Sequence, residues 1–158
     1  MVLGPCPWAR VSLWKRLPPL GQKQQTLVAR STAVAYRFKM ECIDLRQKLS
    51  LFNDHWSPRI IAALNGQEVK LAKFSGEFDW HSHKDADEMF LVIEGSFTME
   101  FRDRKVELHQ GQMIVVPRGV EHRPLAKSEC SVVLFEPAGL LNTGDGTSTD
   151  RSTQGTWV

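Results

Sequence analysis

The feature that most constrains the fold is a series of short β-like runs between residues 59 and 136, separated by turn signals and without helical periodicity. In the run from Phe97 to Arg102 apolar and polar residues alternate, which predicts a strand with one buried face. Closely spaced strands without helices between them predict an antiparallel sandwich, jelly roll or barrel and exclude a parallel α/β fold. The predicted strands are Arg59–Leu64, Gln67–Phe74, Glu88–Ile93, Phe97–Arg102, Lys105–Leu108, Gln112–Val116, Val120–Lys127 and Cys130–Glu136.

The remaining sequence divides into flanking segments around one domain, as expected for 158 residues of which 42% are hydrophobic. Residues 1–40 contain seven basic and no acidic residues, and we expect a disordered basic leader. Two alternatives are a mitochondrial presequence and a translation start at Met40. Residues 41–57 form a helical lead-in with Asp44 as N-cap. The β-barrel covers 58–137, and the Gly-, Ser- and Thr-rich residues 138–158 are expected to be mostly disordered.

Charge and cysteine content restrict the partners and the compartment. After Met40 the chain has 13 basic and 18 acidic residues, and this acidic body argues against nucleic-acid binding. The three cysteines of the chain are widely spaced, which favours a reduced cytoplasmic protein, or a mitochondrial one if the leader is a transit peptide. No uncharged apolar run approaches the roughly 18 to 20 residues of a membrane span, so no membrane association is expected.

A cluster of metal-ligand residues follows Trp80. His81 and His83 are two apart, so in an extended chain both side chains point the same way, roughly 6 to 7 Å apart. Glu88 arrives on the next strand, and His122 would have to come from a neighbouring one. Imidazoles beside a carboxylate are a fitting ligand set for a first-row divalent ion. The sequence therefore predicts a divalent metal site, against the alternative that some of these residues are ordinary polar ones.

The spacing of these residues resembles the cupin superfamily, in particular its small single-domain members. The first cupin motif is matched by Gly76, His81, His83, Glu88 and Gly95, and the second by Gly111, Pro117, Gly119 and His122. Two departures are the four residues, rather than five, between Gly76 and His81, and Ala126 in place of an asparagine. The resemblance implies a double-stranded β-helix (a jelly-roll barrel) with the metal in its mouth. It also implies a homodimer, for which Arg59–Leu64 is a candidate pairing edge.

The identity of the ion decides what the site can do. Four protein ligands would complete the shell of a four-coordinate zinc ion and make it structural. Iron, manganese, nickel or cobalt, with five or six ligands, would keep positions open for water, substrate or dioxygen. The sequence leaves all five ions possible.

Period-two alternation predicts which apolar side chains line the cavity beside the metal. The same residues could equally form the barrel core. The predicted lining consists of Phe90, Val92, Phe97, Met99, Phe101, Val120 and Pro124.

Other polar residues are interpreted as structural. Asp85 and Asp87 lie in a charged turn rather than acting as bases, and His55 and His109 have no ligand partner at useful spacing. We therefore assign no catalytic residue.

Two classes of function fit this sequence. One is a metal-dependent enzyme acting on a small polar molecule, for which the resemblance suggests a dioxygenase or a sugar-phosphate isomerase or epimerase. The other is a non-catalytic ligand-binding protein whose metal is structural, because this fold hosts many unrelated activities.

Overall fold

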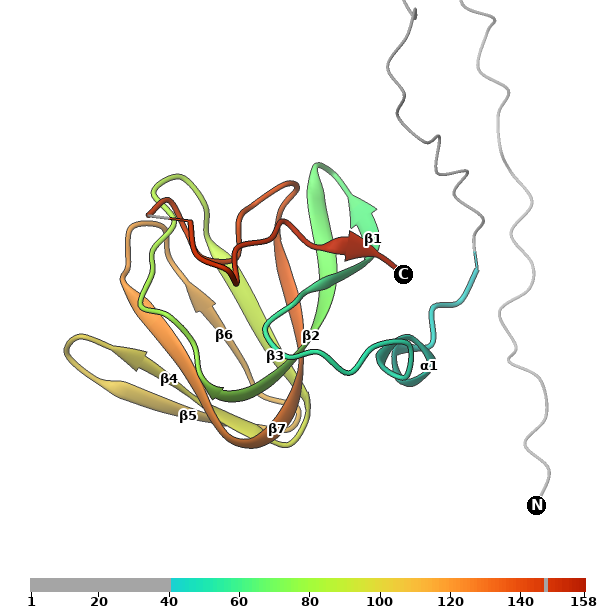
Figure 1. Ribbon diagram of the computed structural model, residues 1–158, viewed down its shortest axis with the longest axis horizontal. Coiled ribbons are helices and arrows are strands. Elements are labelled where there is room, and N and C mark those ends of the chain that lie inside the picture. Colours follow the sequence, from blue (N-terminus) through green and yellow to red (C-terminus); the bar gives the residue numbers. More distant parts are fainter. Residues whose placement is uncertain (1–40, 147) are drawn as a thin grey trace, which may run out of the picture. The chain divides into compact units, whose positions relative to one another are not determined.

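The computed structural model describes residues 41–146 and 148–158, so the predicted leader at 1–40 lies outside the described residues. One short helix precedes eight strands (Figure 1). These elements are α1 (Leu45–Leu49), β1 (Arg59–Leu64), β2 (Gln67–Glu77), β3 (Glu88–Glu94), β4 (Ser96–Phe101), β5 (Lys105–His109), β6 (Met113–Val116), β7 (His122–Pro137) and β8 (Thr156–Trp157).

The lead-in helix is limited to α1 and is capped as the sequence predicts. The Asp44 carboxylate accepts hydrogen bonds from the backbone N–H groups of Arg46 and Gln47, at 2.9 and 3.1 Å. Leu49 at its end packs with Phe52 in a small cluster that includes Leu71 of β2. The helix therefore covers part of the sheet through a few apolar contacts.

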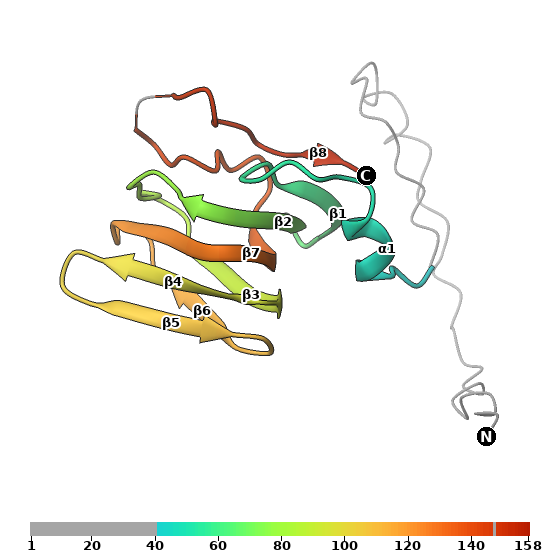
Figure 2. The same cartoon turned by 60° about the horizontal axis from the view of Figure 1, so that its bottom comes forward.

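Strand β7 organises the barrel. Its first residues pair with β4, its later residues pair with β3, and β2 runs antiparallel along its other side. Beyond these neighbours lie β5 next to β4, β6 next to β3, and β1 next to β2. Because one long strand pairs with two successive partners, the sheet curls around the core (Figure 2). This arrangement confirms the predicted all-β fold.

Two strand predictions differ from the structure. The runs Val120–Lys127 and Cys130–Glu136 were expected as separate strands, but the backbone continues through both as β7. The intervening Ser128 and Glu129 remain extended, because β2 shifts its register past them between Phe74 and Gly76.

Residues 138–146 and 148–158 of the C-terminal segment form turns, hydrogen bonds and a short strand, whereas the sequence predicted mostly disorder for 138–158. The segment returns along the barrel and ends as β8, which pairs in parallel with Arg59 and Ile60 of β1. β8 thereby occupies part of the edge that we assigned to a dimer partner. The homodimer stays a prediction.

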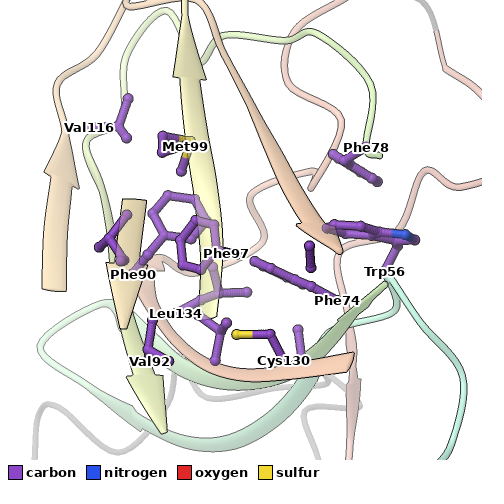
Figure 3. Close-up of a cluster of buried hydrophobic side chains, with 14 of the residues drawn as sticks. Trp56, Phe74, Phe78, Phe90, Val92, Phe97, Met99, Val116, Cys130 and Leu134 are labelled. Carbon is purple, nitrogen blue, oxygen red and sulfur yellow. The ribbon is translucent and has the colours of Figure 1, made fainter. Parts of the chain in front are cut away.

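The barrel interior is filled by aromatic and branched side chains (Figure 3). Trp56 stacks on Phe74 and Phe78, with ring centroids 4.5 and 5.0 Å apart. Cys130 is buried among them, and burial raises the pKa of its thiol to about 11, as expected of a core cysteine. Among the described residues, no helix is long and apolar enough to cross a membrane.

Candidate metal centre

His81 and His122 are held together by their own backbones. Each donates its N–H to the carbonyl oxygen of the other, at 3.0 and 2.9 Å, which makes them a directly opposed antiparallel pair. Side chains of such a pair project from the same face of the sheet. Their imidazole centroids consequently lie only 4.2 Å apart.

Glu88 and His83 approach from the neighbouring strand and turn. Glu88 is the first residue of β3, and the inward alternation of this strand buries Glu88 and Phe90. Its Oε2 atom lies 3.0 Å from Nε2 of His83 and 3.2 Å from Nε2 of His122. The ligand atoms of His81, Glu88 and His122 fall within 4.8 Å of one another, and His83 is adjacent through Glu88.

Backbone carbonyls fix the tautomers of two histidines. Nδ1 of His81 lies 2.9 Å from the Asp79 carbonyl oxygen, and Nδ1 of His122 lies 2.9 Å from that of Val120. A carbonyl oxygen only accepts, so the proton of each neutral ring is on Nδ1. Nε2 is then an unprotonated lone pair aimed at the cluster, which is how metal-binding histidines are oriented.

The buried polar atoms at the centre fit a cation. Both ring nitrogens of His83, Oε2 of Glu88 and Nε2 of His122 are buried and have no hydrogen-bond partner among the residues that the structure describes. Nε2 of His122 and Oε2 of Glu88 face each other as two acceptors, because this Nε2 carries no hydrogen. Unpaired buried acceptors are costly, and a bound divalent ion would satisfy Oε2 of Glu88, Nε2 of His122 and one ring nitrogen of His83. The donor set therefore supports metal binding, without fixing the ion.

A small cavity of about 30 Å³ adjoins the cluster. Seven of its lining side chains are apolar, and the polar ones are His81, Glu88, Glu136 and Asn142. Two of the predicted lining residues, Phe90 and Pro124, are present. The apolar lining consists of Trp56, Pro58, Phe74, Phe78, Phe90, Pro124 and Leu134.

The other five predicted lining residues are not part of this cavity. Four of them, Val92, Phe97, Met99 and Phe101, belong to the hydrophobic core, and Val120 packs against it. For Val92, Phe97 and Met99 the physical reason is that the barrel is narrow, so inward-facing side chains along its length pack against one another.

Comparison with known proteins places this geometry in a family. Residues 67–136 match the family model of the cupin domain. A crystal structure of a cupin-2 domain protein from Shewanella frigidimarina is 52% identical and superimposes with a TM-score of 0.60. That alignment covers 60% of this chain and 93% of the other. This chain belongs to the cupin family.

Two further relatives agree with this assignment to the cupins. The crystal structure of the Neisseria meningitidis protein NMB1881 is 36% identical with a TM-score of 0.57, over 61% of this cupin and 99% of that chain. The Bacillus subtilis protein YdbB is 41% identical over 64 residues, which are 40% of this cupin. The match spans only 57% of the length of YdbB.

Seven cavity residues of the cupin were not predicted from the sequence, namely Trp56, Pro58, Phe74, Phe78, Leu134, Glu136 and Asn142. Trp56 has a positive φ of 59°, unusual for a bulky residue, and its indole N–H donates to the Ser75 carbonyl oxygen at 2.9 Å. Glu136 reaches the cavity from the far end of β7, and Asn142 from the C-terminal segment. Trp56 and Asn142 have no motif or period that marks them as cavity residues. Only the alternation of β7 could have indicated that Glu136 points inward.

Burial and neighbouring charges shift the acidities within the cupin site. Burial, helped by the nearby His122, lowers the pKa of His81 to about 4. Burial opposes ionisation of Glu88, yet the His83 imidazole, 3.0 Å away, holds its pKa below the usual range. Burial and the charge of Glu88 raise the pKa of Glu136 to about 8. At neutral pH His81 is therefore neutral and able to bind a metal.

The shift at His81 predicts acid sensitivity of the metal-free cupin. Its folded pKa of about 4 lies below the 6.5 of an unperturbed histidine. The stability contributed by this lowered pKa is complete above pH 6.5 and is lost as the pH falls toward 4. The full loss amounts to about 3 kcal/mol. Urea unfolding across this range should show a steeper decline for the wild type than for His81→Asn, and parallel curves would contradict the assignment.

The other polar residues hold turns or lie at the surface. Asp87 accepts hydrogen bonds from the backbone and guanidinium of Arg118, which supports its interpretation as a turn residue. His55 contacts Glu129 at 2.9 Å, and the side chain of His109 is 60% exposed. These contacts give the residues no part in the metal centre.

Proposed function

We propose that this cupin is a metal-dependent enzyme acting on a small, uncharged and largely apolar molecule, with the ion held by His81, His83, Glu88 and His122. The observation that carries the proposal is the set of unpaired ligand atoms beside an aromatic-lined cavity. A bound divalent ion there would act as a Lewis acid or bind dioxygen. The protein's own residues would orient the substrate and exclude water.

The cavity lining favours one of the two reaction classes that the sequence suggests. Recognition of a phosphate group depends on cationic side chains or backbone N–H groups, and among the described residues no Lys or Arg lines this cavity. A sugar-phosphate isomerase is therefore disfavoured. Trp56, Phe74 and Phe78 instead suit an apolar substrate held by contact area, and we propose an oxidoreductase of the dioxygenase class.

A second candidate is a non-catalytic cupin with a structural ion. It is favoured by the size of the cavity, since about 30 Å³ accommodates little more than water. In this alternative the ion simply satisfies the buried acceptors.

The coordination of Co²⁺ separates these candidates. We expect the purified protein to bind one Co²⁺ with the weak visible absorption of five- or six-coordinate cobalt, because the catalytic site keeps positions open. Azide, a small anionic ligand, should then change this spectrum. An intense tetrahedral spectrum that azide leaves unchanged would support the structural ion. Failure of Co²⁺ to bind would overturn both candidates.

A further inference from the structure

The C-terminal segment runs along one end of the barrel before it joins the sheet as β8 (Figures 1 and 2). We call residues 139–146 and 148–155 the strap. Its Asn142 lines the cavity together with Trp56 and Pro58. At its far end, Gly155 lies so near the Pro58 carbonyl that an added Cβ would be 3.0 Å from the oxygen. The strap is thus in close contact with residues at the edge of the cavity.

Asn142 holds the strap together and fastens it to the barrel. Its Nδ2 donates to the carbonyl oxygens of Trp56, at 3.1 Å, and Arg151, at 3.0 Å. Its Oδ1 accepts from the N–H of Thr153 at 2.7 Å, and its own N–H donates to the Thr153 carbonyl. The hydroxyl group of the buried Thr143 forms a hydrogen bond with that of Ser152, at 2.7 Å. The two halves of the strap therefore form one hydrogen-bonded unit.

The strap also closes over the backbone between two metal ligands. Ser82 lies between His81 and His83, and its carbonyl oxygen accepts from the N–H of Asp145 at 3.2 Å. The Asp145 carboxylate accepts from the N–H of Lys84 at 2.5 Å. Gly144 approaches so closely that an added Cβ would lie 2.4 Å from the Ser82 oxygen. Only glycine permits this contact, and its φ is +74°.

An external groove lies on the outer side of the contact between the strap and Ser82. It has a volume of about 400 Å³, and His81 lines both this groove and the inner cavity. Strap residues, including Thr143 and Asp145, form one wall of the groove. His81 and the strap therefore separate the small inner cavity from a space large enough for an organic ligand.

Polar contacts, rather than core packing, hold the strap closed. Within the described part of the chain, no strap residue belongs to either hydrophobic cluster. Its two ends are fixed: the chain leaves β7 at Pro137, and Lys70 donates to the Gln154 carbonyl at 2.8 Å just before β8. A segment with few apolar contacts between fixed ends can open without unfolding the barrel.

We propose that the strap is a lid over the metal centre, which opens to join the inner cavity to the external groove and so admits a ligand larger than a few atoms. The inference rests on the proposed function for the identity of the ligand, but the motion is a property of the chain itself. In the closed state the lid excludes water from the ion. In the open state the outer groove holds the part of the ligand that the inner cavity cannot.

Two glycines of the strap provide a matched test. Gly144→Ala places a methyl group against Ser82 at a positive φ, whereas a Cβ at Gly146 meets no atom within 4 Å. Hydrogen exchange of the metal-free protein should increase at residues 82–84 and 142–153 in Gly144→Ala, with β7 unchanged. Removal of Co²⁺ by a chelator should be roughly tenfold faster, because a left-handed alanine disfavours the closed strap. Gly146→Ala should match the wild type in both measurements.

The outcomes distinguish the lid from the proposed function. If Co²⁺ does not bind to the wild type, the proposed function fails, and hydrogen exchange still tests the lid. If Co²⁺ binds but Gly144→Ala exchanges and releases it like the wild type, the lid is wrong. If exchange rises throughout β7 as well, the strap is part of the cooperative fold rather than a lid, and the proposal is overturned. Asp145→Ala, which removes the bond to the Lys84 N–H without altering φ, should reproduce the Gly144→Ala result.

Discussion

Replacing His122 with alanine is expected to weaken Co²⁺ binding by more than about 100-fold, since loss of a partner that only supports a metal ligand costs 10- to 100-fold. The Nε2 lone pair of His122 is aimed at the cluster because Nδ1 donates to the Val120 carbonyl. The side chain is 1% exposed, so water cannot easily replace the lost ligand. Isothermal titration of the metal-free protein with Co²⁺ measures the effect.

The matched control is His109→Ala. His109 is an exposed histidine on β5, and its replacement should leave Co²⁺ affinity unchanged. His83→Ala then decides the ligand number: a loss similar to that of His122→Ala identifies His83 as a fourth ligand. A His122→Ala protein that binds Co²⁺ like the wild type would disprove the assignment of this cluster as the metal centre.

The metal residues could be predicted from sequence because their geometry is local or encoded by turns. His81 and His83 face the same way through strand periodicity, and Glu88 follows after one turn. His122 is remote in sequence, yet the spacing of the second motif locates it, and the structure joins it to His81 by two backbone hydrogen bonds. In a barrel of short strands, the sequence spacing of the ligand residues thus predicts their positions, because short turns leave the strands little freedom to shift.

The cavity and the strap could not be predicted because their signals are absent from composition and period. Trp56 enters the cavity through a positive φ, which no hydrophobic pattern reveals. The strap is rich in Gly, Ser and Thr, a composition typical of disorder, because it is held by hydrogen bonds instead of apolar burial. Asn142 contributes both a side chain and a backbone N–H to these bonds, and their partners are nine or more residues away in the chain.

The side-chain amine of Lys70 is enclosed by the barrel wall. Its side chain is 1% exposed, and Nζ lies 2.7 Å from Glu136 and 3.2 Å from Glu68. It also donates to the Gln154 carbonyl of the strap. Even with the pKa of Glu136 raised to about 8, an oxygen of its carboxyl group can accept from Lys70, and Glu68 adds negative charge beside it. This one side chain therefore links β2, β7 and the C-terminal segment.

Lys70→Met is accordingly expected to destabilise the fold by about 1–3 kcal/mol, because it leaves the buried Glu136 carboxyl group without its donor and Glu68 without its cation. Lys127→Met is the control, since Lys127 is exposed and should change stability by less than about 0.5 kcal/mol. Chemical denaturation of the metal-free proteins measures both. Adding Glu136→Gln to Lys70→Met should cost less than Glu136→Gln costs alone, because directly contacting partners are not additive. Additive losses would show that Lys70 and Glu136 stabilise the barrel independently of each other.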